Sequence, residues 1–330
     1  MNKQNHILPL CAVGCMMILI FDARTAISGI HAGIDICLRT LIPSLFPFFV
    51  LSGIMTSALM GQSLFWLRPI GRLCRMPEGS EPLLAMGILS GYPVGAGNLW
   101  NAYQRGQLSL PEARRMVTFC NNAGPAFIFG VLGPFFPSQK WTLELWVIQV
   151  ISSIAIGIIS EETDTKKERA PLKGRTFDIM NNAIRSMSSV CGWVIFFRMV
   201  FEFLNRWLLN QIPPLAQIVL TGLIELSNGA LRLNLIDDIS IRFLIASIIL
   251  SLGGLCILMQ TLTVFPKLDI RHYLTGRMLH AAISFLLSMI VILFQNGRAV
   301  TAMLFLGIGL TGIFSFRLYG RKTKKEVAIP

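Results

Sequence analysis

Several long apolar segments of this chain are interrupted near their centres by polar, glycine-rich bends, and this pattern restricts its fold more than any other feature. The first half has SGYPVGAGN (90–98) and FCNNAGP (119–125), and the second half has ELSNG (225–229) and LSLGG (250–254). A helix that breaks inside a bilayer leaves backbone N–H and C=O groups unpaired, which is tolerated only where protein or a water-filled cavity surrounds them. Breaks at corresponding positions of two halves are typical of transporters whose substrate site lies between two repeats.

Composition indicates a membrane protein. Of the 330 residues, 53% are hydrophobic and 14% are charged, and the mean hydropathy is +0.63, whereas soluble domains have about 25% charged residues. The net charge of +12 is compatible with nucleic-acid binding, but the basic residues lie in short loops and in the C-terminal tail, as the positive-inside bias predicts. We therefore expect a polytopic membrane protein that binds no nucleic acid. The seven cysteines contain no Cys-x-x-Cys pair, so neither a disulfide framework nor a metal site is expected.

Hydropathy predicts about eight spanning helices and two re-entrant helical hairpins. The predicted spans are 7–21, 42–60, 116–136, 142–160, 188–209, 241–265, 279–295 and 299–316. The stretches 82–104 and 214–236 are apolar but interrupted near their centres, and we interpret them as hairpins that enter and leave the membrane on one side. Segment 25–41 is only moderately apolar and is predicted to be an interfacial amphipathic helix, with 177–187 as its counterpart.

The distribution of basic residues predicts the orientation. With the N-terminus inside, most of the 29 Lys and Arg residues face the cytoplasm, as the positive-inside rule requires. The first hairpin then enters from the cytoplasm and the second from outside, so the two halves are predicted to be inverted repeats, which suit alternating access. The fold class is thus an all-α polytopic membrane protein with an inverted-repeat, transporter-like bundle. Its expected parts are an N-terminal helix (1–24), a first repeat (25–160), a charged cytoplasmic linker (161–176), a second, inverted repeat (177–295), a last helix (296–316) and a basic cytoplasmic tail (317–330).

Polar residues at the breaks of the first half are the first candidates for a binding site. The glycines supply a bend, and the freed N–H groups at the start of a half-helix favour a carboxylate or phosphate. Two adjacent asparagines at bilayer depth are costly unless they are hydrogen-bonded. The alternative interpretation is a structural kink with close helix packing, or amides that hold helices together. The substrate-binding candidates here are Ser90, Gly91, Tyr92, Asn121, Asn122 and Gly124.

The second half contributes charged candidates. Glu225 is an intramembrane carboxylate, which points to binding of a coupling cation or proton, or else to a salt bridge with a neighbouring arginine. Arg198 and Glu202 lie four residues apart on one helix face, so they form an internal pair unless Arg198 faces an anionic substrate. The remaining substrate-binding candidates are Ser227, Asn228, Ser251 and Gln260. The sequence shows no Ser/His/Asp set, P-loop or zinc spacing, so we expect a protein that is not an enzyme and has no cofactor or bound metal.

The chain also carries motifs of a known family. These are LIPSLFPF (41–48), SGYPVGA (90–96) and FCNNAGP (119–125), with weaker support from GLIELSNG (222–229) and from the residues between Gly253 and Gln260. At these motifs it resembles the YlbJ-type sporulation integral membrane proteins. Proteins of this type contain paired nucleoside recognition (Gate) domains, related to those of concentrative nucleoside transporters and spore maturation proteins.

The resemblance implies a role in endospore formation. The leading hypothesis is a transporter in the outer forespore membrane. It would move a small anionic heteroaromatic metabolite such as dipicolinate from the mother cell toward the forespore. A nucleoside transporter is the second hypothesis, and a non-transporting membrane scaffold for spore envelope or cortex assembly is the third. A polar cavity at the breaks favours transport, whereas breaks packed shut favour the scaffold. The expected partners are the lipid bilayer and a small-molecule substrate, while a coupling cation or proton and a homo-oligomer stay open.

Overall fold

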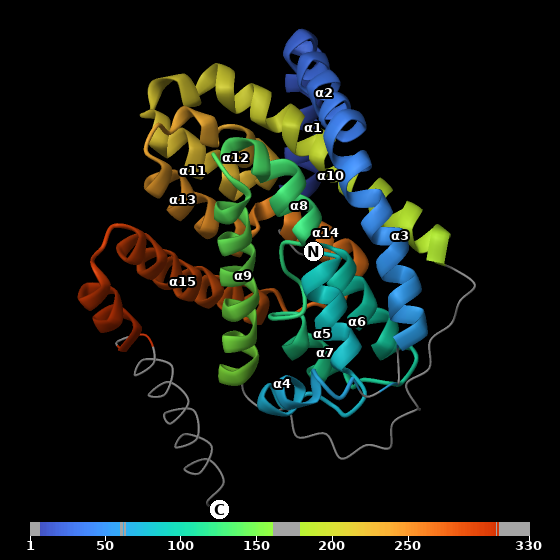
Figure 1. Cartoon of the computed structure of the whole chain (residues 1–330). Coiled ribbons are helices and arrows are strands. Elements are labelled where there is room, and N and C mark those ends of the chain that lie inside the picture. Colours follow the sequence, from blue (N-terminus) through green and yellow to red (C-terminus); the bar gives the residue numbers. More distant parts are fainter. Residues whose placement is uncertain (1–6, 60–61, 63, 161–178, 308, 310–330) are drawn as a thin grey trace, which may run out of the picture.

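The computed structural model describes residues 7–59, 62, 64–160, 179–307 and 309, and every regular element within these ranges is a helix (Figure 1). Among the described residues, five helical stretches are long and apolar enough to cross a membrane: Ala23–Leu59, Gln139–Ile159, Ile179–Trp207, Ile239–Val264 and Ile270–Gln295. The prediction of an all-helical, multi-pass protein is therefore confirmed. The predicted linker 161–176, the tail 317–330 and residues 308 and 310–316 of the last span lie outside the described residues, and 299–307 is helical.

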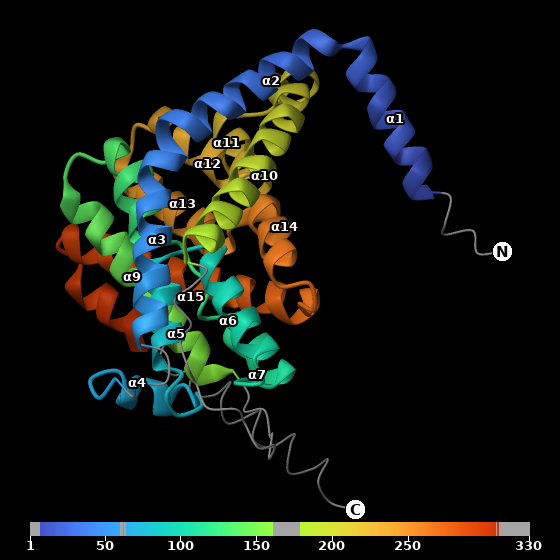
Figure 2. The ribbon, with the colours of Figure 1, turned by 90° about the vertical axis from the view of Figure 1, so that its right-hand side faces the viewer.

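The first half begins with two helices that meet at an angle. Helix α1 (Ile7–Phe21) projects away from the other helices in Figure 2. Helix α2 (Ala23–Ile36) continues through a π-helical turn (Cys37–Leu41) into α3 (Ile42–Leu59). The segment predicted as a separate interfacial helix is therefore joined to the following span in one long helical stretch.

Close packing against a helix of the second half accounts for this difference. Helix α10 (Ile179–Trp207) lies along α2 (Figures 1 and 2). Gly29 and Gly33 form a Gly-x-x-x-Gly pattern on α2, and a Cβ atom on them would lie 2.6 Å from Met199 Cα and 2.8 Å from Ile195 Cα, respectively. Small residues at this spacing allow the backbones of membrane helices to approach closely. Segment 25–41 is thus a packed helix.

The first hairpin consists of α5 (Glu81–Leu89) and α6 (Val94–Gln104), and it follows the short helix α4 (Arg68–Leu73). Its turn lies at 90–93, where Gly91 has a φ of 79°, a left-handed conformation that favours glycine. Helix α7 (Leu110–Met116) comes next, and an irregular stretch (117–124) separates it from α8 (Pro125–Phe127). The predicted break within this crossing is confirmed. A π-helical turn (Ile128–Leu132), a 3-10 turn (Gly133–Phe135) and α9 (Gln139–Ile159) complete the first half.

The second half has the same order of elements. After α10 come α11 (Pro214–Ile224), α12 (Leu226–Leu231), α13 (Ile239–Leu252), α14 (Gly254–Val264) and α15 (Ile270–Gln295), with 3-10 turns at Leu209–Gln211 and Leu233–Leu235. The break between α13 and α14 lies at Gly253, as predicted. The break in the second hairpin lies at Glu225, at the start of the predicted bend 225–229, because the Glu225 side chain accepts hydrogen bonds from the backbone N–H groups of Ser227 and Asn228 and starts a new helix there.

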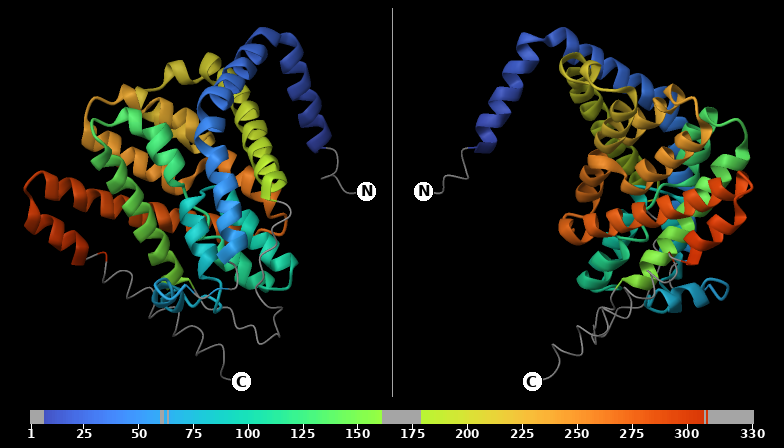
Figure 3. Two further views of the ribbon diagram at one scale, coloured as in Figure 1. Left: turned by 45° about the vertical axis from the view of Figure 1, so that its right-hand side comes forward. Right: turned by 90° about the vertical axis from the view of Figure 1, so that its left-hand side faces the viewer.

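The two hairpins lie at opposite ends of the molecule. In Figures 1 and 3, α5 and α6 are at the lower end with α4 and α7, and α11 is at the upper end beside α13. Buried apolar side chains form one cluster around α3, α9, α10 and α13 and another around α5, α6, α7 and α14. Large apolar side chains are also exposed on α2, α3, α10 and α15, as expected for helices that face lipid.

Candidate functional site

The tips of the two hairpins and both helix breaks meet inside the protein. A small cavity of about 30 Å³ lies between the two hairpin tips. Its other walls come from Gly124 of the first break, from α14 beyond the second break, and from apolar side chains of α3 and α10. Of the residues predicted to bind substrate or a coupling ion, Ser90, Gly91, Tyr92, Gly124, Glu225, Ser227 and Gln260 line it. A cavity of this volume holds about one water molecule. The hairpin tips are therefore closed around their meeting point in this conformation.

Each hairpin packs backbone to backbone against the break in its own half. A Cβ atom on Gly91 would lie 2.7 Å from the Gly124 nitrogen, and a Cβ atom on Gly254 would lie 2.7 Å from the Gly222 carbonyl oxygen. No side chain fits between these pairs. The glycines at the bends thus serve close packing as well as the turn itself.

Glu225 is hydrogen-bonded within its own hairpin. Its two carboxylate oxygens accept hydrogen bonds from the N–H groups of Ser227 (2.9 Å) and Asn228 (2.7 Å). The N–H groups at the start of α12 are therefore already paired with a carboxylate. Arg198 donates to the Asn228 side-chain oxygen (2.9 Å) and lies 3.8 Å from the Glu202 carboxylate. Arg198 thus forms the internal pair expected from the helix spacing and also connects α10 to α12.

The adjacent asparagines do not line the small cavity. Asn121 accepts a hydrogen bond from the Ala96 N–H (3.3 Å) and donates to the Thr261 hydroxyl (3.2 Å). Asn122 donates to the Ser153 hydroxyl (3.0 Å). These bonds connect the break before α8 to α6, α14 and α9, which agrees with the interpretation of the amides as helix-packing groups.

Ser251 belongs to a separate buried polar layer between α9, α13 and α15. Gln149 donates to the Ser251 hydroxyl (2.9 Å), and Ser284 donates to Ser152 (2.9 Å). The Nε2 atom of His280 lies 3.3 Å from the Gln149 carbonyl oxygen. Hydrogen bonds between apolar helices of this kind stabilise membrane bundles. The structure therefore places Ser251 away from the hairpin tips.

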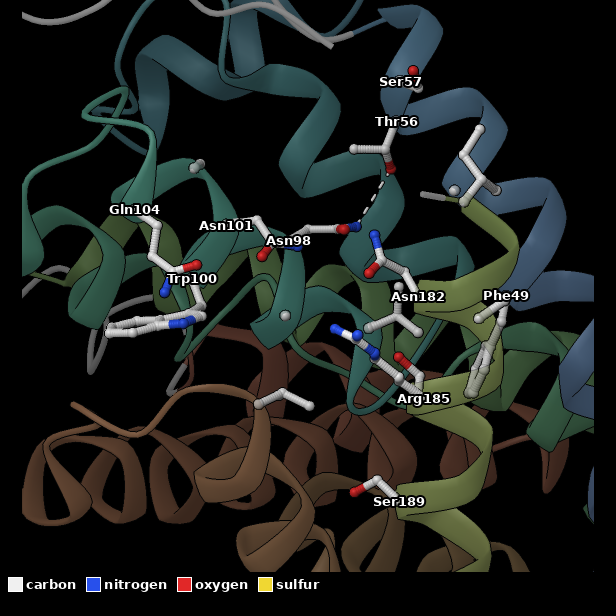
Figure 4. A pocket seen from close by; sticks show the side chains of 18 of the residues that line it. Phe49, Thr56, Ser57, Asn98, Trp100, Asn101, Gln104, Asn182, Arg185 and Ser189 are labelled. Atoms are coloured by element: carbon white, nitrogen blue, oxygen red, sulfur yellow. Dashed lines mark hydrogen bonds between the residues drawn. The ribbon is translucent and has the colours of Figure 1, made fainter. Parts of the chain in front are cut away.

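A larger hollow, called the vestibule below, lies beside the small cavity (Figure 4). Its volume is about 430 Å³, within the range of sites for small metabolites. Walls from α3, α6, the first part of α10 and the end of α14 present the polar side chains of Thr56, Ser57, Asn98, Asn101, Gln104, Arg105, Asn182, Arg185, Ser186, Ser189 and Thr263. Ser189 lines the vestibule and the adjacent Val190 lines the small cavity, so the two spaces are neighbours along α10.

The vestibule is positively charged. Arg105 and Arg185 are both exposed, and neither pairs with a carboxylate in the described part of the chain. In Figure 4 the Arg185 side chain extends into the hollow toward α6. Ser189 has a buried hydroxyl without a hydrogen-bond partner among the described residues. None of the described lining residues is a carboxylate, so the vestibule offers hydrogen-bond donors and positive charge.

The α10 wall of the vestibule was not among the residues predicted from sequence. Asn182, Arg185, Ser186 and Ser189 occupy positions i, i+3, i+4 and i+7, which places them on one face of a helix. This polar stripe in a long apolar helix is the signal that could have identified them. It was assigned instead to an interfacial helix over 177–187.

These features define a class of protein: a polytopic helical membrane protein with two hairpins and two broken helices around polar cavities. The chain is similar to the sporulation integral membrane protein YlbJ of Bacillus subtilis (strain 168), with 24% identity over 308 residues, covering 77% of this chain and 74% of that protein. This similarity supports the resemblance to the YlbJ-type sporulation integral membrane proteins that the motifs predicted. No family model matches the chain, and no solved structure matches it.

Proposed function

We propose that this protein transports a small anionic metabolite across a membrane during endospore formation. The observation that supports this function best is the vestibule, which combines about 430 Å³ of space with two arginines that pair with no described carboxylate. Positive charge and hydrogen-bond donors in a partly enclosed space favour an anion over a neutral or cationic solute. Dipicolinate, a planar dianion, has the size and charge that such a space accommodates.

The arrangement of the hairpins supports two inverted repeats. Each half contains a long helix, a hairpin, a broken helix and a second long helix, and the hairpin tips approach one small cavity from opposite ends. Transporters with inverted repeats place their substrate between such discontinuous helices near the membrane midplane. The ends of α3, α6 and α14 and the start of α10 adjoin loops whose basic residues predict a cytoplasmic location. The vestibule therefore faces the cytoplasm in this proposal.

Transport in this scheme requires the hairpin tips to separate. The small cavity between them holds about one water molecule, so a metabolite in the vestibule reaches a binding position only after the tips move. This conformation is then one that is accessible from the vestibule side and closed at the tips. The coupling role of Glu225 stays a prediction, and uptake unchanged by Glu225→Gln would remove it.

The proposal is tested by uptake of labelled dipicolinate into liposomes that contain the purified full-length protein. Replacing one arginine of the vestibule, by Arg185→Gln or Arg105→Gln, is expected to lower uptake about tenfold or more, because each change removes a charge-assisted interaction of about 1.5–3 kcal/mol. Arg271→Gln is the matched control. Arg271 is an exposed arginine at the start of α15 that does not line the vestibule, so its replacement is expected to leave uptake unchanged.

Competition experiments separate the alternatives. Unlabelled nucleosides that abolish uptake, or that are themselves transported faster than dipicolinate, would assign the vestibule to a nucleoside. A well-folded protein that neither binds nor moves either class of solute contradicts transport. That outcome would favour a membrane scaffold in spore envelope assembly.

A further inference from the structure

Arg277 has the largest side chain among the fully buried residues that the structure describes. It lies on α15, is 1% exposed, and forms no ion pair with any described carboxylate. A charged group inside a membrane protein is expensive to bury unless other groups compensate for the water it loses. The groups around Arg277 must therefore supply this compensation by dipoles rather than by an opposite charge.

The Arg277 guanidinium is surrounded by neutral oxygen atoms from three segments. Its Nη2 atom donates to the Tyr92 hydroxyl (2.6 Å) and to the Leu250 carbonyl (3.3 Å). Its Nη1 atom donates to the Asn121 carbonyl (3.2 Å) and lies 3.5 Å from the Asn122 side-chain oxygen. The Tyr92 hydroxyl donates in turn to the Leu250 carbonyl (2.7 Å). One guanidinium thus contacts the first hairpin tip and both helix breaks.

The two carbonyl groups are available because the helices end there. Leu250 lies in the last turn of α13, and Asn121 lies in the irregular stretch after α7. Carbonyl groups at the end of a helix have no partner within that helix and carry partial negative charge, which favours a cation. In transporters with discontinuous helices, carbonyls of unwound backbone and of half-helix ends coordinate the coupling Na⁺ or H⁺.

We propose that the Arg277 guanidinium is a tethered cation that occupies the cation position between the two helix breaks and holds the first hairpin tip against them. A free coupling cation is then not needed at this position. What this means for ion coupling rests on the proposed transport function. The hydrogen bonds of Arg277 themselves do not depend on the identity of the substrate.

The test is thermal unfolding of the full-length protein in detergent. Arg277→Ala is expected to lower the melting temperature by about 5 °C or more, because it leaves several buried oxygens without their donor. The smaller side chain also leaves space for a guanidinium group, so millimolar methylguanidinium is expected to restore part of the lost melting temperature. Arg277→Met is the matched control, because it removes the charge but fills much of the space; it is expected to be destabilised and not to respond to methylguanidinium. Arg277→Lys retains a cation and is expected to melt above Arg277→Met.

Two results would overturn the inference: an Arg277→Met protein as stable as the wild type, or an Arg277→Ala protein that methylguanidinium does not stabilise. If Arg277→Ala cannot be obtained folded, the other two variants decide, and equal melting temperatures for Arg277→Lys and Arg277→Met contradict a tethered cation. The wild-type melting temperature is expected not to respond to methylguanidinium. If methylguanidinium stabilises Arg277→Ala but the wild type shows no uptake, the tethered cation stands and the proposed transport fails. If the wild type shows uptake but methylguanidinium does not stabilise Arg277→Ala, transport stands and the tethered cation fails.

Discussion

At the residue scale, neighbouring glycines of the first hairpin have different roles. A Cβ atom on Gly87 or Gly95 would lie 2.0 Å or 2.1 Å from the Cys120 carbonyl oxygen, which is far inside van der Waals contact. A Cβ atom on Gly97, two residues further along the same helix, would lie 3.9 Å from its nearest neighbour, Val264 Cβ. Gly95 is therefore required by packing, whereas Gly97 is not.

Comparison of Gly95→Ala with Gly97→Ala tests this difference. The Cβ at position 95 must displace a backbone carbonyl, so Gly95→Ala is expected to lower the melting temperature by roughly 3–10 °C, or to prevent recovery of folded protein. Gly97→Ala is expected to leave it unchanged or slightly raised, because alanine favours a helix over glycine. Size-exclusion chromatography of detergent-solubilised protein after heating measures both, and equal melting temperatures would contradict the packing described here.

The bends were predictable at this scale, but the surroundings of the polar residues were not. Gly and Pro restrict the backbone locally, so the four breaks lie at or close to their predicted positions. Asn121 and Ser251 resemble Ser90 in sequence, since all three are polar residues beside a break, yet distant helices take up the hydrogen bonds of the first two. Arg277 lies between the predicted spans 241–265 and 279–295, because an arginine lowers the hydropathy of any window that includes it. Such long-range pairing leaves no local pattern.

At the element scale, the contact between α2 and α10 joins the beginnings of the two halves. It depends on Gly29 and Gly33, which face the α10 backbone, and the Cys37 thiol nearby lies 3.8 Å from the Cys191 carbonyl oxygen. Gly192 is on α10 as well, but a Cβ atom there would meet no other atom within 4 Å. Only the α2 glycines are therefore part of this helix–helix contact.

Replacing one glycine by leucine on α2 and, separately, one on α10 distinguishes the effect of packing from that of helix propensity. Gly33→Leu is expected to separate α2 from α10 and to destabilise the protein strongly, with a melting temperature lower by about 5 °C or more. Gly192→Leu changes the same residue type in a helix of similar apolar character, and it is expected to be tolerated. The melting temperatures of the two detergent-solubilised variants are compared. A Gly33→Leu protein as stable as the wild type would show that the packing of α2 does not depend on this contact.

At the scale of the whole molecule, the vestibule lies beside the ends of α3, α6 and α14, whose basic neighbours in the sequence predict a cytoplasmic location. Asn182 is exposed in the vestibule wall, and Lys140 is exposed at the start of α9, which the charge pattern places on the opposite face of the membrane. The predicted orientation therefore places the vestibule on the cytoplasmic side of the membrane.

Labelling of introduced cysteines tests the orientation. In a background without native cysteines, Asn182→Cys is expected to react with a membrane-impermeant maleimide only from the cytoplasmic side. Lys140→Cys is expected to react only from the other side. Reaction of both positions from the same side would exclude the inverted arrangement of the two hairpins.

The direct contact between each hairpin and its own break determines where the protein can open. Gly91 touches Gly124, and Gly222 touches Gly254, with no side chain between them. Neither hairpin can slide along its break without losing this contact, so each hairpin and its broken helix form a rigid body. In the proposed transport cycle, movement then takes place between the two halves. Arg277 reaches from the second half to the first hairpin, and its hydrogen bonds would break and re-form with every cycle.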